Sequence, residues 1–363
     1  SGRGAWGLPL TGGRGRCPMA SGGGKAEGGG LRREGSASRR GILKLGAGLA
    51  GLGLFPAACA GTGKAPWRGV NLIATPDAPL GSPACERSLR RLRDLGGNAV
   101  CLIPFLWQSA PDDPRIVLGD AVSPDQLRAG IRQVRALGLR VMVKPHVWVP
   151  QTWAGAIEFS RPEDQAEWLG RYRTLLLDLA TLAQEEGAGA LALGTELRGV
   201  SGDPAWTDII RAVRDRFRGT LTYVAHWDGE LDRLPFRSLL DVPSISLYPP
   251  LGDDDAGLPA RIDMLAANLA RQAPLWIGEL GLRSAVSGQA KPWESPEERD
   301  AHPDGALQAR VLDHWLAALN RHGLHDILLW RWFSDPDAGG PQDTDFTLQG
   351  KPAEAVMKRH FAG

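Results

Sequence analysis

The sequence predicts a single (β/α)8 TIM barrel over residues 67–363, preceded by a segment outside the fold. From Trp67 onward, short apolar runs alternate eight times with longer amphipathic stretches. The runs are apolar on both faces, as buried parallel strands are, and eight such units in about 300 residues suit a closed barrel. The structural alternative is a doubly wound open sheet. The first run continues as "GVNLIATPDAPLG", without the GxGxxG phosphate loop of that fold, so the barrel is favoured and no cofactor is expected.

The apolar runs give the predicted strands, and periodic stretches give the helices. The strands occupy residues 68–74, 99–107, 140–149, 190–197, 221–227, 242–248, 274–282 and 326–333. The clearest helix lies between Glu163 and Glu186, where apolar residues recur at spacings of three and four. Further helices are predicted at 85–95, 124–137, 204–217, 259–272 and 305–321 and in the tail "KPAEAVMKRHF". The connection 228–241 has room for about two helical turns.

Composition and charge exclude some classes of function. The formal net charge is +1, so no overall field attracts nucleic acid. The chain has 13 Trp against 3 Tyr and 8 Phe, which predicts either a Trp-rich core or a Trp-rich binding surface. Cys85 falls in a predicted helix and Cys101 in the strand after it, so two buried free thiols are expected instead of a disulfide.

The N-terminal segment is predicted to be an export signal. Residues 1–35 are rich in Gly, Arg and Ser, so disorder is expected, and Met19 offers an alternative start within them. In residues 36–60, twin arginines precede a short Gly-rich apolar stretch, which resembles a twin-arginine signal of bacteria. Cys59 follows "FPAA", a weak lipoprotein box that predicts membrane attachment through a lipid, and cleavage after Ala60 is the alternative. The expected location is periplasmic, membrane-anchored or extracellular.

The carboxyl ends of the strands face one shared mouth, where TIM barrels carry their active sites. Glu196 stands at the end of the fourth predicted strand and Glu279 at that of the seventh, nearly opposite around the ring. Other strand ends bring aromatic and hydrogen-bonding side chains to the same mouth: Trp107, Lys144, His146, Trp148, His226, Tyr248 and Trp330.

These residue types suit the hydrolysis of a glycosidic bond. One carboxylic acid protonates the leaving oxygen, and a second, ionised carboxylate attacks or stabilises the anomeric carbon. A retaining enzyme holds the pair about 5 to 5.5 Å apart, close enough that one carboxyl keeps a proton at neutral pH. Tryptophan faces stack on sugar rings, and we expect this of Trp107, Trp148 and Trp330. Trp168, Trp276 and Trp315 are assigned to the core.

Three alternatives compete with this interpretation. Either glutamate alone could form a structural ion pair. His146 and His226 could ligate a metal with Glu196, as in a metal-dependent hydrolase, but no HExxH motif occurs and no metal is expected. The barrel could also hold glycan without cleaving it, in an envelope or phage-tail-like assembly. The acidic loops 252–257 and 334–345 are expected to be solvated turns, because they lack a calcium-ligand spacing.

Five segments together resemble glycoside hydrolase family 113, which includes β-1,4-mannanases: "VKPHVWVPQTWAGAI", "LALGTEL", "LTYVAHW", "IGELGLRS" and "LQGKPA". The resemblance runs from about Trp67 to the C-terminus. It implies Glu196 as acid/base and Glu279 as nucleophile, with subsites lined by Lys144, His146, Trp148, His226 and Tyr248. In the wider clan an Asn commonly precedes the acid/base and holds the sugar 2-hydroxyl. Thr195 stands there in this chain, so its shorter side chain leaves the sugar in the cleavage subsite open.

The sequence therefore predicts an exported retaining glycoside hydrolase. Its expected substrate is a β-linked polysaccharide or oligosaccharide, with β-1,4-mannan first.

Overall fold

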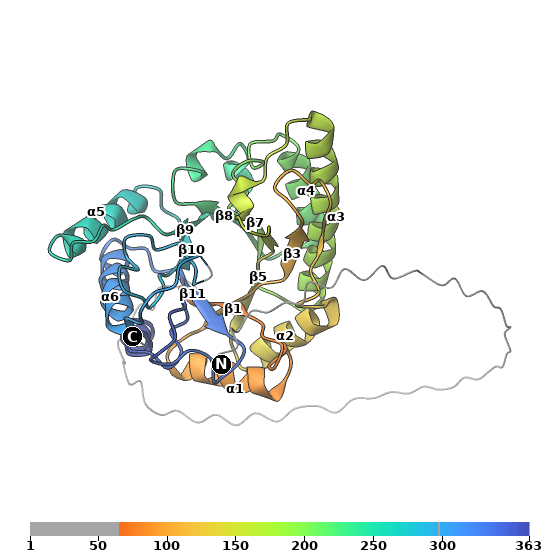
Figure 1. The fold of residues 1–363 in the computed structure, drawn as a ribbon. Coiled ribbons are helices and arrows are strands. Elements are labelled where there is room, and N and C mark those ends of the chain that lie inside the picture. The colour runs from red at the N-terminus through yellow and green to blue at the C-terminus, as the bar shows by residue number, and fades with distance from the viewer. Residues whose placement is uncertain (1–64, 297, 363) are drawn as a thin grey trace, which may run out of the picture. The chain divides into compact units, whose positions relative to one another are not determined.

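A closed ring of parallel strands forms the centre of the protein. The computed structural model describes residues 65–296 and 298–362. Their barrel strands follow the order β1-β11-β10-β9-β8-β7-β5-β2, and β2 pairs with β1 to close the ring (Figure 1). The predicted eight-stranded TIM barrel is confirmed. The predicted segments 1–35 and 36–60, with Cys59, lie outside the described residues.

The barrel strands and the helices outside them alternate along the chain. The strands are β1 (Arg68–Ile73), β2 (Ala99–Leu102), β5 (Arg140–Val143), β7 (Ala190–Thr195), β8 (Thr220–His226), β9 (Ser244–Leu247), β10 (Trp276–Leu280) and β11 (Ile327–Phe333). The helices are α1 (Pro83–Asp94), α2 (Pro124–Ala136), α3 (Pro162–Glu185), α4 (Trp206–Arg216), α5 (Leu258–Ala270), α6 (Gly305–Arg321) and α7 (Ala353–Phe361). The connection after β8 holds only two short 3-10 turns, η2 (Leu231–Arg233) and η3 (Arg237–Leu239), and another, η1 (Ala154–Ala156), precedes α3.

Local sequence signals explain where the first helices begin. The Ser82 and Ser123 hydroxyls accept hydrogen bonds from the first turns of α1 and α2, and a proline follows each serine. A side-chain cap at this position satisfies a backbone N–H that has no partner within the helix. Proline suits the first helical position because it has no N–H to satisfy there.

Two predicted strands are each divided in two, which corrects the sequence prediction. The run 99–107 forms β2 and then β3 (Phe105–Gln108), and the run 140–149 forms β5 and then β6 (His146–Trp148). Pro104 and Pro145 lie at the breaks, because a proline has no N–H to give to the ladder. β3 pairs with β6 and with β4 (Ile116–Leu118) in a separate three-stranded sheet.

The core has one layer between strands and helices and a second inside the barrel. Small side chains fill much of the interior, including Ala99, Ala190 and Ala192. Of the tryptophans assigned to the core, Trp168 and Trp315 are buried, and Trp276 packs on Trp67 with ring centroids 5.1 Å apart.

Both cysteines of the described chain are free and buried, as predicted. Burial raises the pKa of Cys85 to about 11 and that of Cys101 to about 12.

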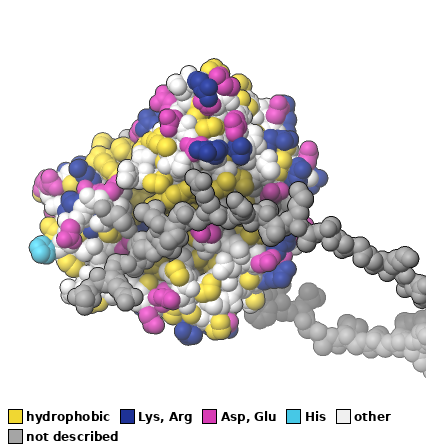
Figure 2. Space-filling view, turned by 45° about the vertical axis from the view of Figure 1, so that its right-hand side comes forward, with side chains coloured by type: hydrophobic (Ala, Val, Ile, Leu, Met, Phe, Trp, Pro, Cys, Tyr) yellow, Lys and Arg dark blue, Asp and Glu magenta, His cyan; other side chains and the backbone are white. Residues whose placement is uncertain are grey.

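The outer surface carries both signs of charge. Figure 2 shows basic and acidic side chains interleaved over one face, consistent with a net charge of only +1. No helix among residues 65–296 and 298–362 is long and apolar enough to span a bilayer.

Candidate active site

Glu196 and Glu279 meet at the carboxyl end of the barrel. Glu196 directly follows β7 and Glu279 lies within β10, with β8 and β9 between those strands. The Glu279 side chain is buried, and that of Glu196 is 13% exposed. Glu279 is paired with Ser246 across β10 and β9, and the Ser246 hydroxyl donates to the Glu196 carboxylate, so the two carboxyls are near neighbours.

Glu279 is held by a buried cation and a phenol. Lys144, directly after β5, is fully buried and forms an ion pair with Oε1 of Glu279. Tyr248, directly after β9, donates its hydroxyl to Oε2 at 2.9 Å. Burial raises the pKa of Glu279 above its ordinary value, and the Lys144 ammonium opposes this shift. Removing one partner of such a buried pair leaves an uncompensated charge, so Lys144 and Glu279 depend on each other.

Glu196 has an unusual backbone conformation, and its hydrogen-bond partners differ from those of Glu279. Its φ is +54°, in the left-handed region, which is costly for a residue other than glycine and is typical of functional sites. Its carboxylate hydrogen-bonds His226 Nδ1 at 2.8 Å and accepts from the Ser246 hydroxyl. Burial raises the pKa of Glu196, but the hydrogen bond and charge of His226, together with Ser246, outweigh burial and leave it below the ordinary value.

A third buried carboxylate, Glu230, supports the Glu196 turn. Its Oε2 accepts from the backbone N–H of His226 at 2.6 Å, and its Oε1 accepts from Tyr223 at 2.7 Å and from Ser201 at 2.8 Å. The Tyr223 hydroxyl in turn accepts from the N–H of Leu197 at 2.8 Å. Glu230 thus fixes both the residue after Glu196 and the histidine that contacts it. Burial raises its pKa.

His146 and Thr195 lie beside the pair. His146 packs between Phe105 and Trp330, with ring centroids 5.8 and 5.9 Å away. Burial, followed by the nearby Lys144 charge, lowers its pKa to about 4, so the ring is neutral at pH 7. Its Nδ1 is buried without a hydrogen-bond partner among the described residues. Thr195 turns its hydroxyl toward the Pro145 carbonyl oxygen, 3.4 Å away.

The structure separates the three tryptophans predicted as subsite walls. Trp330 lies in β11, with Lys144 Nζ 5.0 Å from its ring centroid. Trp107 and Trp148 stand side by side in the small β3–β6 sheet, 36% and 48% exposed, and not at the ends of barrel strands. Phe105, 6.1 Å from Trp148 and next to His146, connects that sheet to the site.

Sequence reasoning missed three residues of the site: Trp153, Ser246 and Glu230. Trp153 is 38% exposed and packs against His226 with ring centroids 4.7 Å apart. A serine inside a strand and an acid in a short connection look ordinary, and the high Trp count was the only general sign of Trp153. Next to His226, Trp227 stacks on Trp293 at 6.2 Å and 22°, and Trp293 is 45% exposed.

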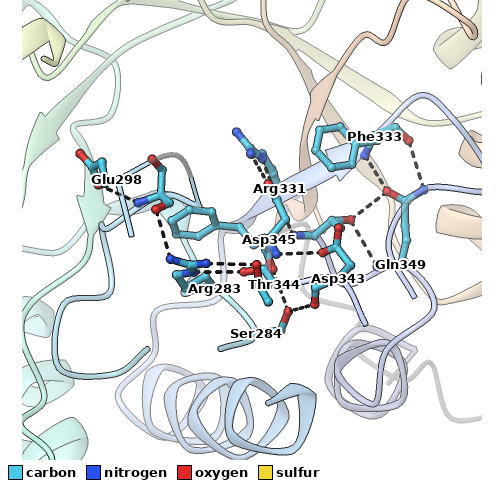
Figure 3. Close-up of polar contacts among 12 residues, drawn as sticks. Arg283, Ser284, Glu298, Arg331, Phe333, Asp343, Thr344, Asp345 and Gln349 are labelled. Carbon is cyan, nitrogen blue, oxygen red and sulfur yellow. Dashed lines mark hydrogen bonds and ion pairs between the residues drawn. The ribbon is translucent and has the colours of Figure 1, made fainter. Parts of the chain in front are cut away.

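The acidic loop 334–345 is a solvated turn only in part: Asp337 is exposed, but the end of the loop at Asp345 is buried. Asp345 is buried and forms a bidentate ion pair with Arg331, in which Nε lies 2.9 Å from Oδ1. Lys351 binds Asp343 Oδ1 at 2.6 Å and the Asp345 carbonyl at 2.8 Å. Figure 3 shows Arg331, Asp343 and Asp345 close together. The loop 252–257, by contrast, exposes all three of its aspartates, as expected. The described residues contain no cluster of three or more His, Cys, Asp or Glu side chains suited to a metal.

The loop 334–345 connects to the site through Phe346, the residue that follows it. Its ring lies edge-on to Tyr248 with centroids 6.4 Å apart, and the Arg331 guanidinium lies 5.7 Å from its centroid. Tyr248 donates to Glu279, so the Arg331–Asp345 pair braces that side of the mouth.

The fold and the site together define a glycoside hydrolase built on a TIM barrel. Two carboxyl groups lie at the carboxyl end of its barrel, and each has its own set of hydrogen-bond donors. Residues 75–351 match the description Glycoside Hydrolase Family 113, and the chain belongs to this family.

Solved structures agree with this assignment. The β-mannanase AaManA of Alicyclobacillus acidocaldarius, a family 113 member in complex with ManMIm, is 26% identical, with a TM-score of 0.71 over 82% of this chain and 98% of that one. Another structure, a family 113 β-1,4-mannanase in complex, is 23% identical, with a TM-score of 0.72 over 83% and 100% of the two chains. No protein in the curated set matches the chain.

Proposed function

We propose that the protein is a retaining glycoside hydrolase in which Glu196 is the acid/base and Glu279 the nucleophile. The observation that carries the proposal is the difference between their partners. A buried ammonium pairs with Glu279 and favours the charge that a nucleophile needs. Among residues 65–296 and 298–362, the Glu196 carboxylate is hydrogen-bonded by His226 and Ser246 and has no such ammonium beside it.

The reaction proceeds in two displacements. Glu196 gives its proton to the glycosidic oxygen while a Glu279 carboxylate oxygen bonds to the anomeric carbon, so that the alcohol leaves and a glycosyl ester forms. Water then attacks the same carbon, Glu196 takes its proton, and the ester bond to Glu279 breaks. The released sugar has the configuration of the substrate, and both carboxyls return to their starting states.

The two carboxyls share one titration, because each lies within the field of the other. The active pair holds one proton. In the free protein His226 and Ser246 favour charge on Glu196, and burial favours the proton on Glu279. A sugar at the mouth excludes water from Glu196 and favours its protonated form, while Lys144 stabilises the charge left on Glu279. Activity therefore falls at high pH, when the pair loses its proton, and at low pH, when it gains a second.

β-1,4-Mannan is the proposed substrate. Support comes from the family and from the named activity of AaManA, 26% identical to this chain. Reducing-sugar release from mannan, glucomannan, xylan and chitosan tests this choice. Release from mannan or glucomannan alone is expected, and binding of mannan without release would instead favour a glycan-holding barrel.

Azide separates the two roles. With an activated β-glycoside, azide should rescue Glu279→Ala by taking the place of the nucleophile, which gives the α-glycosyl azide. It should rescue Glu196→Ala by attacking the glycosyl ester, which gives the β-azide. Exchanged product anomers would reverse the assignment, and rescue of neither variant would contradict the mechanism.

We also propose export through the twin-arginine route on the sequence of residues 36–60 alone. Blocking that route in the producing cell should leave the activity in the cytoplasm. Unchanged secretion would contradict this proposal.

A further inference from the structure

The strand that carries Glu279 holds one residue more than the strands on either side of it. Between Ile277 and Leu280, β10 advances three residues, whereas β9 advances two, over residues 245–247, and β11 also two, over residues 327–329. The extra residue makes a β-bulge next to Glu279. A bulge interrupts the alternation of side chains between the two faces of a strand.

The bulge decides which way Glu279 points. Ile277 and Leu280 both belong to the apolar cluster that strands and helices share, although residues three apart in a regular strand face opposite sides. In a regular strand Glu279, two residues after Ile277, would face this same apolar layer. Because of the extra residue it faces the barrel interior instead, where it pairs with Lys144 from β5 on the opposite side of the ring. The direction of the Glu279 carboxylate therefore depends on how the bulge is held.

The side-chain amide of Asn71, in β1, contacts the bulge. Asn71 is fully buried, and its Nδ2 donates to the Gly278 carbonyl at 3.0 Å, although β11 lies between β1 and β10 in the ring (Figure 1). The carbonyl oxygens of Leu328 and Leu329 in β11 lie 3.5 and 3.3 Å from the same nitrogen. A bulge leaves groups of the ladder unpaired, and a buried carbonyl needs a donor. Asn71 supplies this donor at the residue directly before Glu279.

The bulge is fixed from a second side by close packing. A Cβ atom on Gly278 would clash with the Ser244 hydroxyl and lie 3.0 Å from a methyl group of Val224, so the position accepts only glycine. Asn71 itself is not explained by packing. Its Oδ1 is buried with no hydrogen-bond partner among the described residues, a cost that an apolar side chain of similar size would avoid. The amide is explained by the donor that it supplies.

We propose that Asn71 is a positioning residue for Glu279, whose amide fixes the bulge in β10 and thereby the direction of the attacking carboxylate. It acts through the Gly278 carbonyl. This inference rests on the proposed function, in which Glu279 is the nucleophile. A displaced nucleophile attacks more slowly, and a displacement of about 1 Å can cost about a hundredfold in rate.

Asn71→Leu tests the donor, because leucine has a similar size and no N–H in its side chain. A 2-deoxy-2-fluoro mannoside with an activated leaving group labels Glu279, and the rate of labelling measures attack by this carboxylate. We expect that rate to fall about tenfold or more. The acid limb of the kcat/KM profile should also move to higher pH, because displacement weakens the contact with Lys144, whose charge lowers the pKa of Glu279.

The matched control is Thr222→Val. Thr222 is fully buried in β8, and its hydroxyl has no hydrogen-bond partner among the described residues. The variant removes a buried polar atom and no hydrogen bond, so the labelling rate and the acid limb should stay unchanged.

Asn71→Ser, whose hydroxyl is too short to replace the amide, is the second variant if leucine prevents folding, which circular dichroism checks. Labelling at the wild-type rate in a folded Asn71 variant would overturn the inference. Failure of both variants to fold would also overturn it, because Asn71 would then be a purely structural residue. A wild-type protein that the reagent neither labels nor serves as substrate would instead contradict the proposed function.

Discussion

Glu196 and Glu279 differ in the direct contacts of their carboxyl groups and in the residues that support those contacts. Glu279 lies in β10, where the pairing with β9 shifts register, and its carboxylate pairs with a buried cation. The Arg331–Asp345 pair supports this side through Phe346 and Tyr248. Glu196 lies in a left-handed backbone conformation, and its carboxylate is hydrogen-bonded by His226 and Ser246. Glu230 supports this side through the backbone N–H of His226. In the proposed mechanism one carboxyl keeps its charge until it bonds to carbon, and the other gains and loses a proton. The two environments match these requirements.

Neutralising either glutamate should have the largest effect. Glu279→Gln and Glu196→Gln should each lower kcat by about a thousandfold or more on mannan, because one loses the nucleophile and the other the proton donor. Steady-state kinetics measures the loss, and circular dichroism checks the fold. Appreciable turnover by either correctly folded variant would contradict the roles proposed for the two glutamates.

Lys144→Met comes next, because it removes the cation from the Glu279 side only. The pKa of Glu279 should rise further, so the acid limb of the kcat/KM profile moves to higher pH. A buried carboxylate without its partner should also cost about 3–5 kcal/mol of stability near neutral pH. The destabilisation should shrink as pH falls, because Glu279 then takes up a proton. An acid limb that does not move would show that Lys144 does not set the charge of Glu279.

Glu230→Gln tests the brace of the Glu196 side. Three donors converge on this carboxylate, and an amide cannot accept from all of them. At least one buried donor therefore stays unpaired, which should lower the free energy of unfolding by about 1–3 kcal/mol. We expect kcat to fall about tenfold with little change in KM, and the alkaline limb of the pH profile to shift. Tyr223→Phe should give part of the same effect. A loss of melting temperature with unchanged kcat and pH profile would reduce Glu230 to a purely structural role.

Asp345→Asn should affect activity less, since this brace reaches Glu279 only through two rings and Tyr248. Its main effect is on stability. Although burial raises the pKa of Asp345, the charge of Arg331 and the hydrogen bonds outweigh burial and hold it below the ordinary value. The wild type therefore gains stability above the ordinary pKa of aspartate and loses it as pH falls through the folded pKa. The difference in melting temperature between wild type and variant should be largest near neutral pH and should narrow in acid.

Thr195→Val should have the smallest effect. The hydroxyl faces the Pro145 carbonyl, so its loss should change kcat/KM on mannooligosaccharides by about threefold or less. A loss of thirtyfold would mean that this hydroxyl binds the sugar.

The barrel could be predicted because eight apolar runs signal buried strands directly. The breaks at Pro104 and Pro145 could not, since β3 and β6 continue the apolar runs and differ only in their pairing partners. Strand ends led to Glu196, Glu279, Lys144, His226 and Tyr248, which the structure brings together. Glu230 and Asp345 were missed because burial of an acid depends on distant partners, and an acidic residue in a loop gives no local sign of them.

The nucleophile assignment can be tested directly by trapping the glycosyl ester. A 2-deoxy-2-fluoro mannoside with an activated leaving group should label the protein, and tryptic digestion should place the added mass on residues 272–283, "QAPLWIGELGLR", which contain Glu279. Label on residues 174–198, which contain Glu196, or no label while the reagent is being hydrolysed, would contradict the account.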